Sequence, residues 1–376
     1  MKPARQSSDA LMVSAARLKR WCIEKALPQW KARAHLKDGS WVEHLKLDGT
    51  ADLEAERRWR VLARQVYVYA KATSLNWYDG RATAEATYHR MKTTGFVHRV
   101  NAAGDVTNSM RDLYDHAFYL LAASSLFDLT QEQAYLEDAN ATLNWIETEL
   151  RHPKGGWKES NHAKLADGRR QNPHMHLFEA SLFLHNITSD PNHLRFAEEV
   201  IQLFDKCIFD KGMISEFFES DWTLAKAPLG QTTEPGHGME WIWLLGQYEK
   251  ATGTSRLTQQ KTLYNRALSE RGWFLNDEET KYGEVRRETK RLWVQTEVIK
   301  AHLAMSEQNV PGARGMASAT IEALFPTYLT PDGLWNDQIN ACGANIAKTI
   351  PVSTFYHIIC MATEAERVAL LSETDE

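Results

Sequence analysis

Two segments of the chain place a histidine and a glutamate three residues apart, beside residues that start helices. In residues 171–179, QNPHMHLFE, asparagine is a preferred helix cap and proline a preferred first helical residue. We therefore expect a helix to begin at Asn172, with His176 and Glu179 on one face near its N-terminus. His174, two residues from His176, should point in another direction.

The second segment, EPGHGME at residues 234–240, repeats this arrangement with His237 and Glu240. The positive end of a helix dipole disfavours a charged imidazolium. We expect such a histidine to stay neutral and to act as an acid or base near pH 7. Glu179 and Glu240 would then orient His176 and His237 and select their tautomers.

A third histidine, His357, follows the proline and hydroxyl residues of TIPVSTFYH, so it also lies in the early turns of a helix. A single buried histidine is more often structural than catalytic. Three with the same placement would converge at one mouth if their helices run parallel in a ring.

Arg64 lies within an apolar stretch of another helix, where a guanidinium needs partners. A structural salt bridge and a cation directed at a ligand oxygen are both open. The preceding arginines, Arg57, Arg58 and Arg60, belong to a charged stretch that we expect to be solvated.

The elements that must position these residues are helical nearly throughout. About twelve helices are expected, beginning near residues 8, 52, 80, 111, 130, 173, 191, 237, 256, 290, 314 and 351. Amphipathic helices alternate with helices that are apolar on almost every side, and the latter must be enclosed by neighbours. This predicts an all-α (α/α)6 barrel of two concentric rings, with an open α-solenoid as the alternative.

One unusual polar or aromatic residue occurs on each enclosed helix, at intervals of 50 to 64 residues. This spacing favours a regular array with one such residue per helical hairpin. The residues are Arg64, Tyr114, His176, His237, Trp293 and His357.

Composition excludes several classes of protein. The 376 residues are 43% hydrophobic with a net charge of −5, and no linker divides them, so a single domain over residues 1–376 is expected. Without a basic stripe, a signal peptide or a long apolar run, we expect no nucleic-acid or membrane partner. Four scattered cysteines suggest a reducing cytoplasm. Most of the 13 tryptophans should be core, and a few could stack on sugars.

Five segments of the chain, taken in sequence order, resemble the N-acylglucosamine 2-epimerase superfamily. This superfamily includes cellobiose 2-epimerases, mannose isomerases and sulfosugar aldose–ketose isomerases. The resemblance covers about residues 50–360 and implies the same barrel. The segments are ARQVYVY (63–69), NPHMHLFEA (172–180), EPGHGMEWIWLL (234–245), WVQTE (293–297) and STFYHI (353–358).

The resemblance implies catalytic roles for Arg64, His176, His237 and His357, and no metal or nicotinamide cofactor. The residues that it places around the substrate are Tyr114, Asn172, Glu179, Glu240 and Trp293. The sequences NPHMH (172–176) and EPGH (234–237) look closer to the aldose–ketose isomerase branch than to the disaccharide epimerases. We therefore expect interconversion of free D-mannose, or D-lyxose, with its ketose (D-fructose for mannose) through a cis-enediol. His237 and His357 would be the acid–base pair, and His176 would assist ring opening.

Other functions stay open from sequence alone. A sugar 2-epimerase of the cellobiose or N-acylglucosamine type shares the enediol. The two His-x-x-Glu pairs could hold zinc or iron, and Glu179 with Glu240 could serve a glycoside hydrolase or lyase. A non-catalytic sugar-binding module would use the aromatic residues alone. The oligomeric state, monomer or homodimer, is also open.

Overall fold

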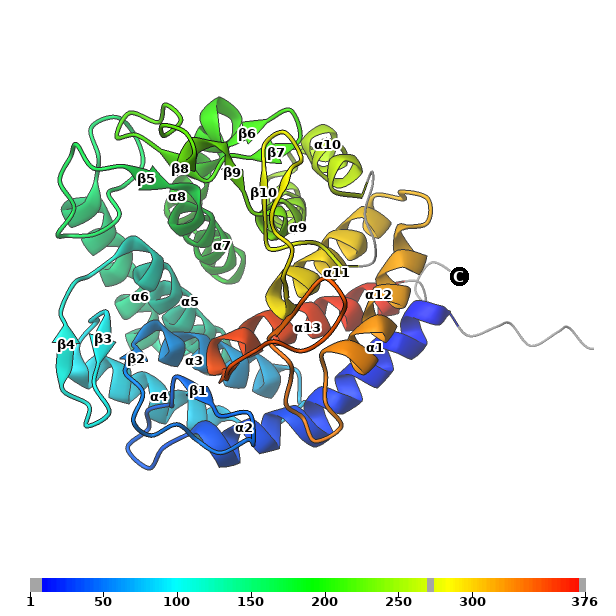
Figure 1. Cartoon of the computed structure of the whole chain (residues 1–376). Coiled ribbons are helices and arrows are strands. Elements are labelled where there is room, and N and C mark those ends of the chain that lie inside the picture. Colours follow the sequence, from blue (N-terminus) through cyan, green and yellow to red (C-terminus); the bar gives the residue numbers. More distant parts are fainter. Residues whose placement is uncertain (1–8, 269–273, 372–376) are drawn as a thin grey trace, which may run out of the picture.

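The computed structural model describes residues 9–268 and 274–371, and helices dominate this part of the chain (Figure 1). Six helices form an inner ring: α3 (Arg60–Ser74), α5 (Leu113–Thr130), α7 (Gln171–Thr188), α9 (Pro235–Thr252), α11 (Leu292–Glu307) and α13 (Phe355–Leu371). Each packs on the next, and α13 packs on α3. This closure confirms the expected (α/α)6 barrel and excludes the open solenoid.

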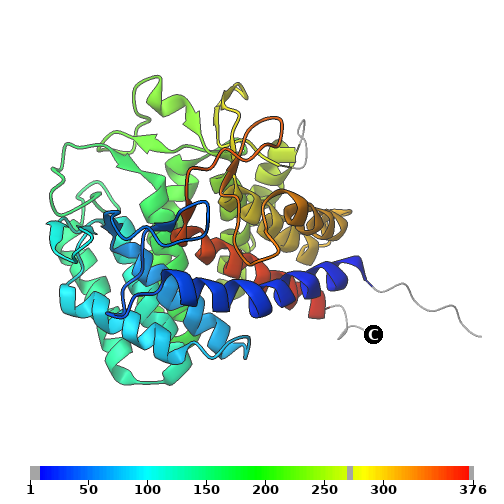
Figure 2. The ribbon, with the colours of Figure 1, turned by 60° about the horizontal axis from the view of Figure 1, so that its bottom comes forward.

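The outer helices each pack against an inner helix. They are α4 (Arg81–Thr94), α6 (Gln133–Trp145), α8 (Pro191–Leu203), α10 (Leu257–Leu268) and α12 (Ala313–Thr327). The sixth position is taken by α1 (Ala10–Trp21), continued by a π-helical turn (Cys22–Ala26) and α2 (Leu27–Ala34). Figure 2 shows this long segment in blue beside the red α13, which α1 contacts.

The two rings differ in burial as their sequences predict. Every residue from 115 to 127 in α5 is buried, because this inner helix has neighbours on all sides. The outer helix α8 instead buries one stripe, which includes Phe196, Ala197 and Val200. Outer helices α6 and α8 end in π-helical turns, Ile146–Leu150 and Phe204–Ile208.

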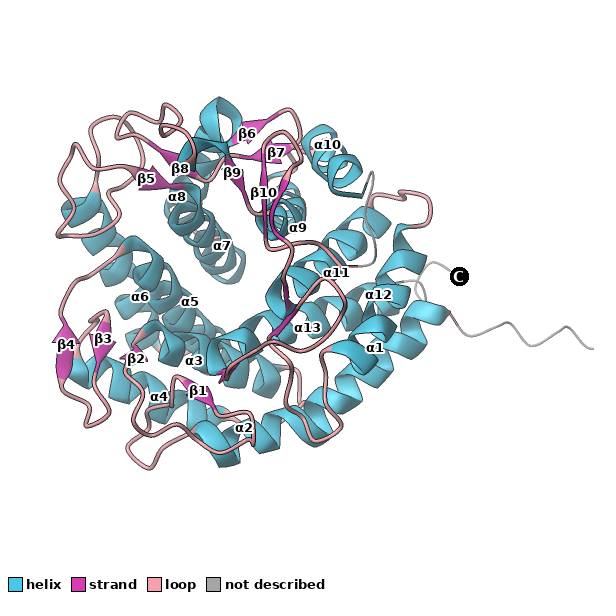
Figure 3. Cartoon of the chain, viewed as in Figure 1, coloured by secondary structure: helices cyan, strands magenta, loops and turns pink. Residues whose placement is uncertain are grey.

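Short antiparallel strands occupy the connections that lead from outer to inner helices (Figure 3). Two sheets have three strands: β3 (Arg99–Val100) lies between β2 (Arg57–Arg58) and β4 (Val106–Asn108), and β10 (Glu278–Thr280) lies between β9 (Thr232–Thr233) and β11 (Val285–Arg287). The other strands form pairs: β1 (His44–Leu45) with β14 (Ile350–Pro351), β5 (Arg169–Arg170) with β8 (Phe217–Phe218), β6 (Phe209–Asp210) with β7 (Met213–Ile214), and β12 (Lys290–Arg291) with β13 (Gln338–Ile339). Strands β2, β5, β9, β12 and β14 end within four residues of the start of an inner helix, so they fix where those helices enter the ring.

The expected helix starts agree with the structure to within four residues, with one exception. The second helix, expected near residue 52, begins at Arg60, because Arg57 and Arg58 form β2 and pair with Val100 and Arg99. Sheet pairing captures this segment, although its local sequence also suits a helix.

The arginines of this segment are not free in solvent, so that expectation was wrong. Arg57 is 4% exposed and donates to the Ser40 hydroxyl at 2.9 Å and to two backbone carbonyls. Arg60 forms a 2.7 Å ion pair with Asp115 of α5. Burial of these guanidinium groups is tolerated because Arg57 has three acceptors and Arg60 has an opposite charge.

In the parts of the chain that the structure describes, no helix is both long and apolar enough to cross a membrane.

Candidate active site

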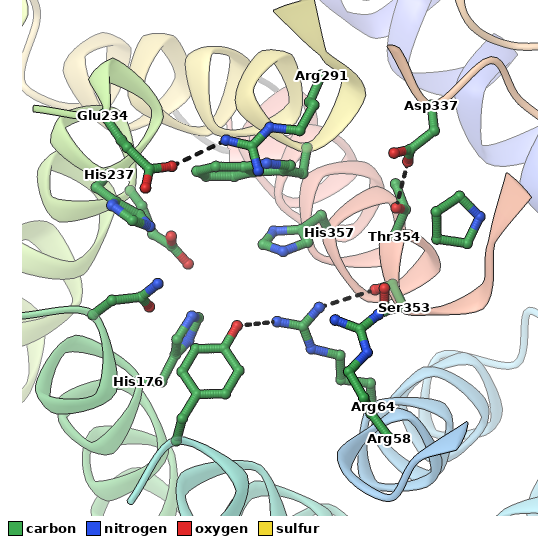
Figure 4. Close-up of a pocket in the computed structure, with 15 residues that line it drawn as sticks. Arg58, Arg64, His176, Glu234, His237, Arg291, Asp337, Ser353, Thr354 and His357 are labelled. Atoms are coloured by element: carbon green, nitrogen blue, oxygen red, sulfur yellow. Dashed lines mark hydrogen bonds and ion pairs between the residues drawn. The ribbon is translucent and has the colours of Figure 1, made fainter. Parts of the chain in front are cut away.

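The six spaced residues singled out from the sequence come from the six inner helices in turn. Each lies within the first six residues of its helix, and together they line one cavity of about 310 Å³ (Figure 4). Six helix starts therefore converge at one mouth of the barrel. The residues are Arg64, Tyr114, His176, His237, Trp293 and His357.

The cavity contains two more of the expected residues, Asn172 and Glu240, whereas Glu179 lies behind His176. Sequence reasoning missed seven lining residues, most of them in the connections before inner helices. These are Arg58, Glu234, Arg291, Asp337, Pro351, Ser353 and Thr354.

Each of the three cavity histidines is anchored at Nδ1 by a buried carboxylate. His176 pairs with Glu179 at 3.0 Å, as the three-residue spacing predicted. His357 pairs with Glu297 of α11 at 2.9 Å. A carboxylate accepts only, so Nδ1 carries the proton and Nε2 is left for the cavity.

The partner of His237 is Glu216, not Glu240, so the predicted pair was wrong. Both oxygens of Glu216 lie 3.0 Å from Nδ1 of His237. Glu216 follows β7 in the connection after α8 and also accepts from the Gln171 side chain at 2.9 Å. Its sequence signal was a lone carboxylate in the apolar run MISEFF, which must find a partner when buried.

Glu240 instead lies close to both other anchored histidines, with a carboxyl oxygen within 4.8 Å of a ring nitrogen of each. It is 1% exposed, and neither of its carboxyl oxygens has a hydrogen-bond partner among the described residues. Burial and the nearby charge of Glu297 raise the pKa of Glu240 well above its ordinary value. Glu240 therefore binds a proton more tightly than an ordinary carboxyl group does.

Asn172 also differs from expectation. Helix α7 begins at Gln171 with Arg170 as its cap residue, so Asn172 is inside the first turn and does not cap it. Its side-chain carbonyl is buried without a hydrogen-bond partner in the described structure, and the residue lines the cavity. The amide is thus available to a ligand.

The histidines have different proton affinities in spite of similar anchors. Burial lowers the pKa of His357 to about 4, with Glu297 only partly offsetting it, and burial likewise lowers the pKa of His176. Burial also opposes charge on His237, but Glu216 and Glu234 outweigh it and raise that pKa to about 9. The sequence suggested that the helix N-terminus would keep His237 neutral. The two carboxylates outweigh that effect, so this expectation was wrong.

Arg64 lines the same cavity as these three histidines (Figure 4). It donates to the Tyr114 hydroxyl at 2.7 Å and to the Ser353 carbonyl at 3.3 Å. No carboxylate within the described ranges forms an ion pair with it, so the structural salt bridge considered above is absent there. Its charge is available to an oxygen of a bound ligand.

The other cavity arginines already have acidic partners. Arg58 forms an ion pair with Glu43, and Arg291 pairs with Glu234 at 3.0 Å and with Asp277 at 3.2 Å. Their charges are therefore compensated at the rim.

Two carboxyl–histidine groups at the cavity floor could in principle hold a metal ion. Their potential ligand atoms lie within 4.8 Å of one another; the groups are His176, Glu179 and Glu240, and Glu240, Glu297 and His357. Lys300, however, already supplies positive charge there through a 2.7 Å ion pair with Glu297. A divalent cation would meet this ammonium, so we expect metal-independent chemistry.

His174 is separate from the cavity, as expected from its register. It is fully buried, accepts from the Trp157 amide at 3.2 Å and pairs with the Arg170 carbonyl at 2.9 Å. Its contacts with protein backbone indicate a structural role.

Comparison with known proteins adds to this geometry. The sequence profile of the N-acylglucosamine 2-epimerase family matches residues 39–361. A "Mannose-6-phosphate isomerase" of Rhizobium meliloti (strain 1021) is 30% identical over 382 residues, covering 94% of this chain and 97% of that protein.

Solved structures share the fold. The cellobiose 2-epimerase of Spirochaeta thermophila DSM 6192 has a TM-score of 0.86 at 21% identity, covering 96% of this chain and 98% of that one. A D-mannose isomerase has a TM-score of 0.81 at 18% identity, covering 98% and 100%.

Gly236 provides a test of how the cavity wall is packed. Trp293 lies between His237 and His357, with ring centroids at 5.3 and 5.6 Å. A Cβ on Gly236 would lie 2.8 Å from Trp293 Cη2, so Gly236→Ala should displace the indole and cost about 1–3 kcal/mol of stability. A crystal structure and thermal unfolding of the variant would measure both effects.

Gly238→Ala is the matched control, because its Cβ would meet only Leu263 at 3.9 Å. It should keep Trp293 in place and slightly stabilise the helix. An undisturbed indole in Gly236→Ala would contradict the proposed packing.

Proposed function

Because the chain belongs to the N-acylglucosamine 2-epimerase family, whose members are sugar epimerases and isomerases, we propose that it interconverts free D-mannose and D-fructose. The observation that carries this proposal is the pairing of a neutral His357 with a protonated His237, which face each other across the cavity (Figure 4). Two titratable groups whose surroundings separate their pKa values form an acid–base pair.

His357 is the base in this scheme. Its Nδ1 proton is held by Glu297, so Nε2 has a free lone pair at neutral pH. It removes the proton from C2 of the open-chain aldose and leaves a cis-enediol. Returning the same proton to C1 gives the ketose.

His237 and Arg64 act on the oxygens. The imidazolium of His237 donates a proton to O1 as the carbonyl becomes an enol, then recovers one from O2 as the ketone forms. Arg64, which has no carboxylate partner in the described structure, stabilises the negative charge that develops on the same oxygens. His176, neutral and anchored by Glu179, assists ring opening.

Isomerisation rather than epimerisation is supported by the relative named as an isomerase and by the isomerase-like motifs. The competing outcome has a physical basis as well. A protonated His237 opposite His357 could return a proton to C2 from the other face, and the fold is shared with cellobiose 2-epimerases. Both reactions use one enediol, so the product decides between them.

A free sugar fits the cavity better than a phosphorylated one, although that relative is named for mannose 6-phosphate. A phosphate group is usually bound by charged donors that are not already paired. Arg58 and Arg291 are paired with acids, and Glu234 and Asp337 add acidic groups to the lining. Arg64 has no acidic partner in the described structure, but it is assigned to the reacting oxygens in this scheme. Mannose should therefore be turned over with a higher kcat/KM than mannose 6-phosphate.

The three anchored histidines should be far more sensitive to substitution than His174. His176→Asn, His237→Asn and His357→Asn should each lower kcat by about 10²–10⁴-fold, the usual contribution of an acid–base group. His174→Asn should instead lower the free energy of unfolding by about 1–3 kcal/mol, because it leaves buried backbone groups unpaired. Steady-state kinetics with denaturant unfolding separates the two effects; equal losses of kcat for His174 and His176 would contradict this assignment.

The pH profile should reflect the two pKa values. Activity requires neutral His357, which is lost as pH falls through about 4, and protonated His237, which is lost as pH rises through about 9. Glu216→Gln removes the leading charge that raises the pKa of His237. The alkaline limb of kcat/KM should therefore move to lower pH, with the acid limb unchanged. An unmoved alkaline limb would refute the role of Glu216.

The deciding experiment is turnover of mannose in deuterated water, followed by NMR. Fructose labelled partly at C1, with little glucose, would support isomerisation by one base. Glucose labelled at C2 without fructose would assign the protein to the epimerases, and faster turnover of cellobiose would reassign the substrate. Activity that EDTA removes and one added metal restores would overturn the metal-independent mechanism.

A further inference from the structure

Lys300 is a charged residue in the interior of the barrel, where a lysine is rarely found. It lies on α11 one turn after Glu297 and has no solvent exposure. Its Nζ is 2.7 Å from Oε2 of Glu297 and 3.8 Å from the ring centroid of Trp243. Burying an ammonium is costly even when a counter-charge is present, so the position of Lys300 in the interior requires a physical reason.

The ion pair is the second link of a chain that ends in the cavity. Oε1 of Glu297 accepts from His357, and Oε2 faces Lys300. Apart from this 2.7 Å contact with Lys300, Oε2 has no donor in the described residues. The charge of Lys300 is thus the main support for this oxygen.

The other two anchoring carboxylates are supported differently. Glu179 accepts a hydrogen bond from the Tyr356 hydroxyl, and Glu216 accepts from the Gln171 side chain and the Glu234 amide. Both have neutral donors in addition to their histidine. Only for Glu297, among these three anchors, does an ammonium take that place.

Several ionisable groups surround the Lys300–Glu297–His357 chain. Facing it are Glu240 from α9, Glu179 and His176 from α7, Arg64 from α3, and Tyr356 and Cys360 from α13. Burial favours protonation of Glu297, but Lys300 and His357 outweigh it and lower its pKa to about 2. Glu240 has no equivalent ion pair, and burial together with the charge of Glu297 raises its pKa instead.

We propose that Lys300 is a positioning residue that keeps Glu297 ionised and thereby leaves His357 free to accept the C2 proton. The proposal rests on the aldose–ketose isomerase function proposed above. Lys300 does not line the cavity. It acts chiefly through its ion pair with Glu297, and its charge also disfavours a proton on His357 directly.

The physical reason is the proton that the pair would otherwise bind. Without Lys300, a carboxylate with one hydrogen bond would remain in a dry interior, and the Glu297–His357 pair would take up a proton. On His357 that proton makes an imidazolium. If the proton binds Glu297, the carboxylic acid donates to Nδ1 of His357. The neutral imidazole then carries its hydrogen on Nε2, which faces the cavity. Both forms lack the lone pair needed for catalysis.

The test is Lys300→Met in the full-length protein, which keeps the shape of the side chain and removes its charge. The acid limb of kcat/KM for mannose should rise by about one to three pH units, the effect of losing an opposite charge nearby. At one pH unit below the new acid limb, kcat/KM of Lys300→Met should be about tenfold lower than that of the wild type, and this difference should become smaller toward pH 8. Lys250→Met, which removes a part-exposed lysine paired with Glu307, should leave the profile unchanged.

The double variant Glu297→Gln/Lys300→Met keeps the test valid if the single variant folds poorly. It removes both charges, so no extra proton-binding site remains and the acid limb should return to the wild-type position, with kcat lowered. Circular dichroism and thermal unfolding check the fold of each variant.

The outcomes separate this proposal from the function on which it rests. Wild-type protein inactive on mannose would overturn the proposed function. Active wild type with an unchanged Lys300→Met profile, or with an equal loss at every pH, would overturn the role of Lys300, because a purely structural defect lowers the active fraction without moving a limb. An acid limb that stays raised in the double variant would show that Lys300 does not act through Glu297.

Discussion

The anchoring of each cavity imidazole by a buried carboxylate at Nδ1 is the interaction on which the site depends. It fixes which ring nitrogen carries the hydrogen, and so which nitrogen can take or give a proton. Without Glu216, Glu297 and Glu179, three histidines at one mouth would have neither a fixed tautomer nor a fixed orientation. Glu179 lies on the same helix as His176, whereas closure of the ring brings Glu216 to His237 and Glu297 to His357.

The cavity histidines have similar carboxylate anchors but different proton affinities, because the charged groups around each anchor differ. His237 lies near two carboxylates, Glu216 and Glu234, and binds its proton tightly. Glu297, the anchor of His357, is compensated by Lys300, so it attracts a proton to His357 less strongly. One type of contact thus provides both an acid and a base, and the difference comes from the charge beyond the contact.

The short strands have a mechanical role in this arrangement. They hold the connections that precede inner helices, and the cavity residues lie in these connections or within the first six residues of those helices. The pairing of β12 with β13 and of β1 with β14 joins connections that are distant in sequence. A cavity assembled from six helix starts needs such links, because each start contributes only one or two groups.

The sequence by itself determined the helical class, the alternation of inner and outer helices and six residues that line the cavity. These follow from periodicity and from spacing within a helix, which are local properties. The His176–Glu179 pair was found for the same reason. Only the tertiary structure decided that Glu216 rather than Glu240 anchors His237, that Glu297 depends on Lys300, and that residues 57–58 form a strand instead of helix. Those outcomes depend on which connections and helix faces meet when the ring closes, and on the charge enclosed there, and neither is encoded within a single helical turn.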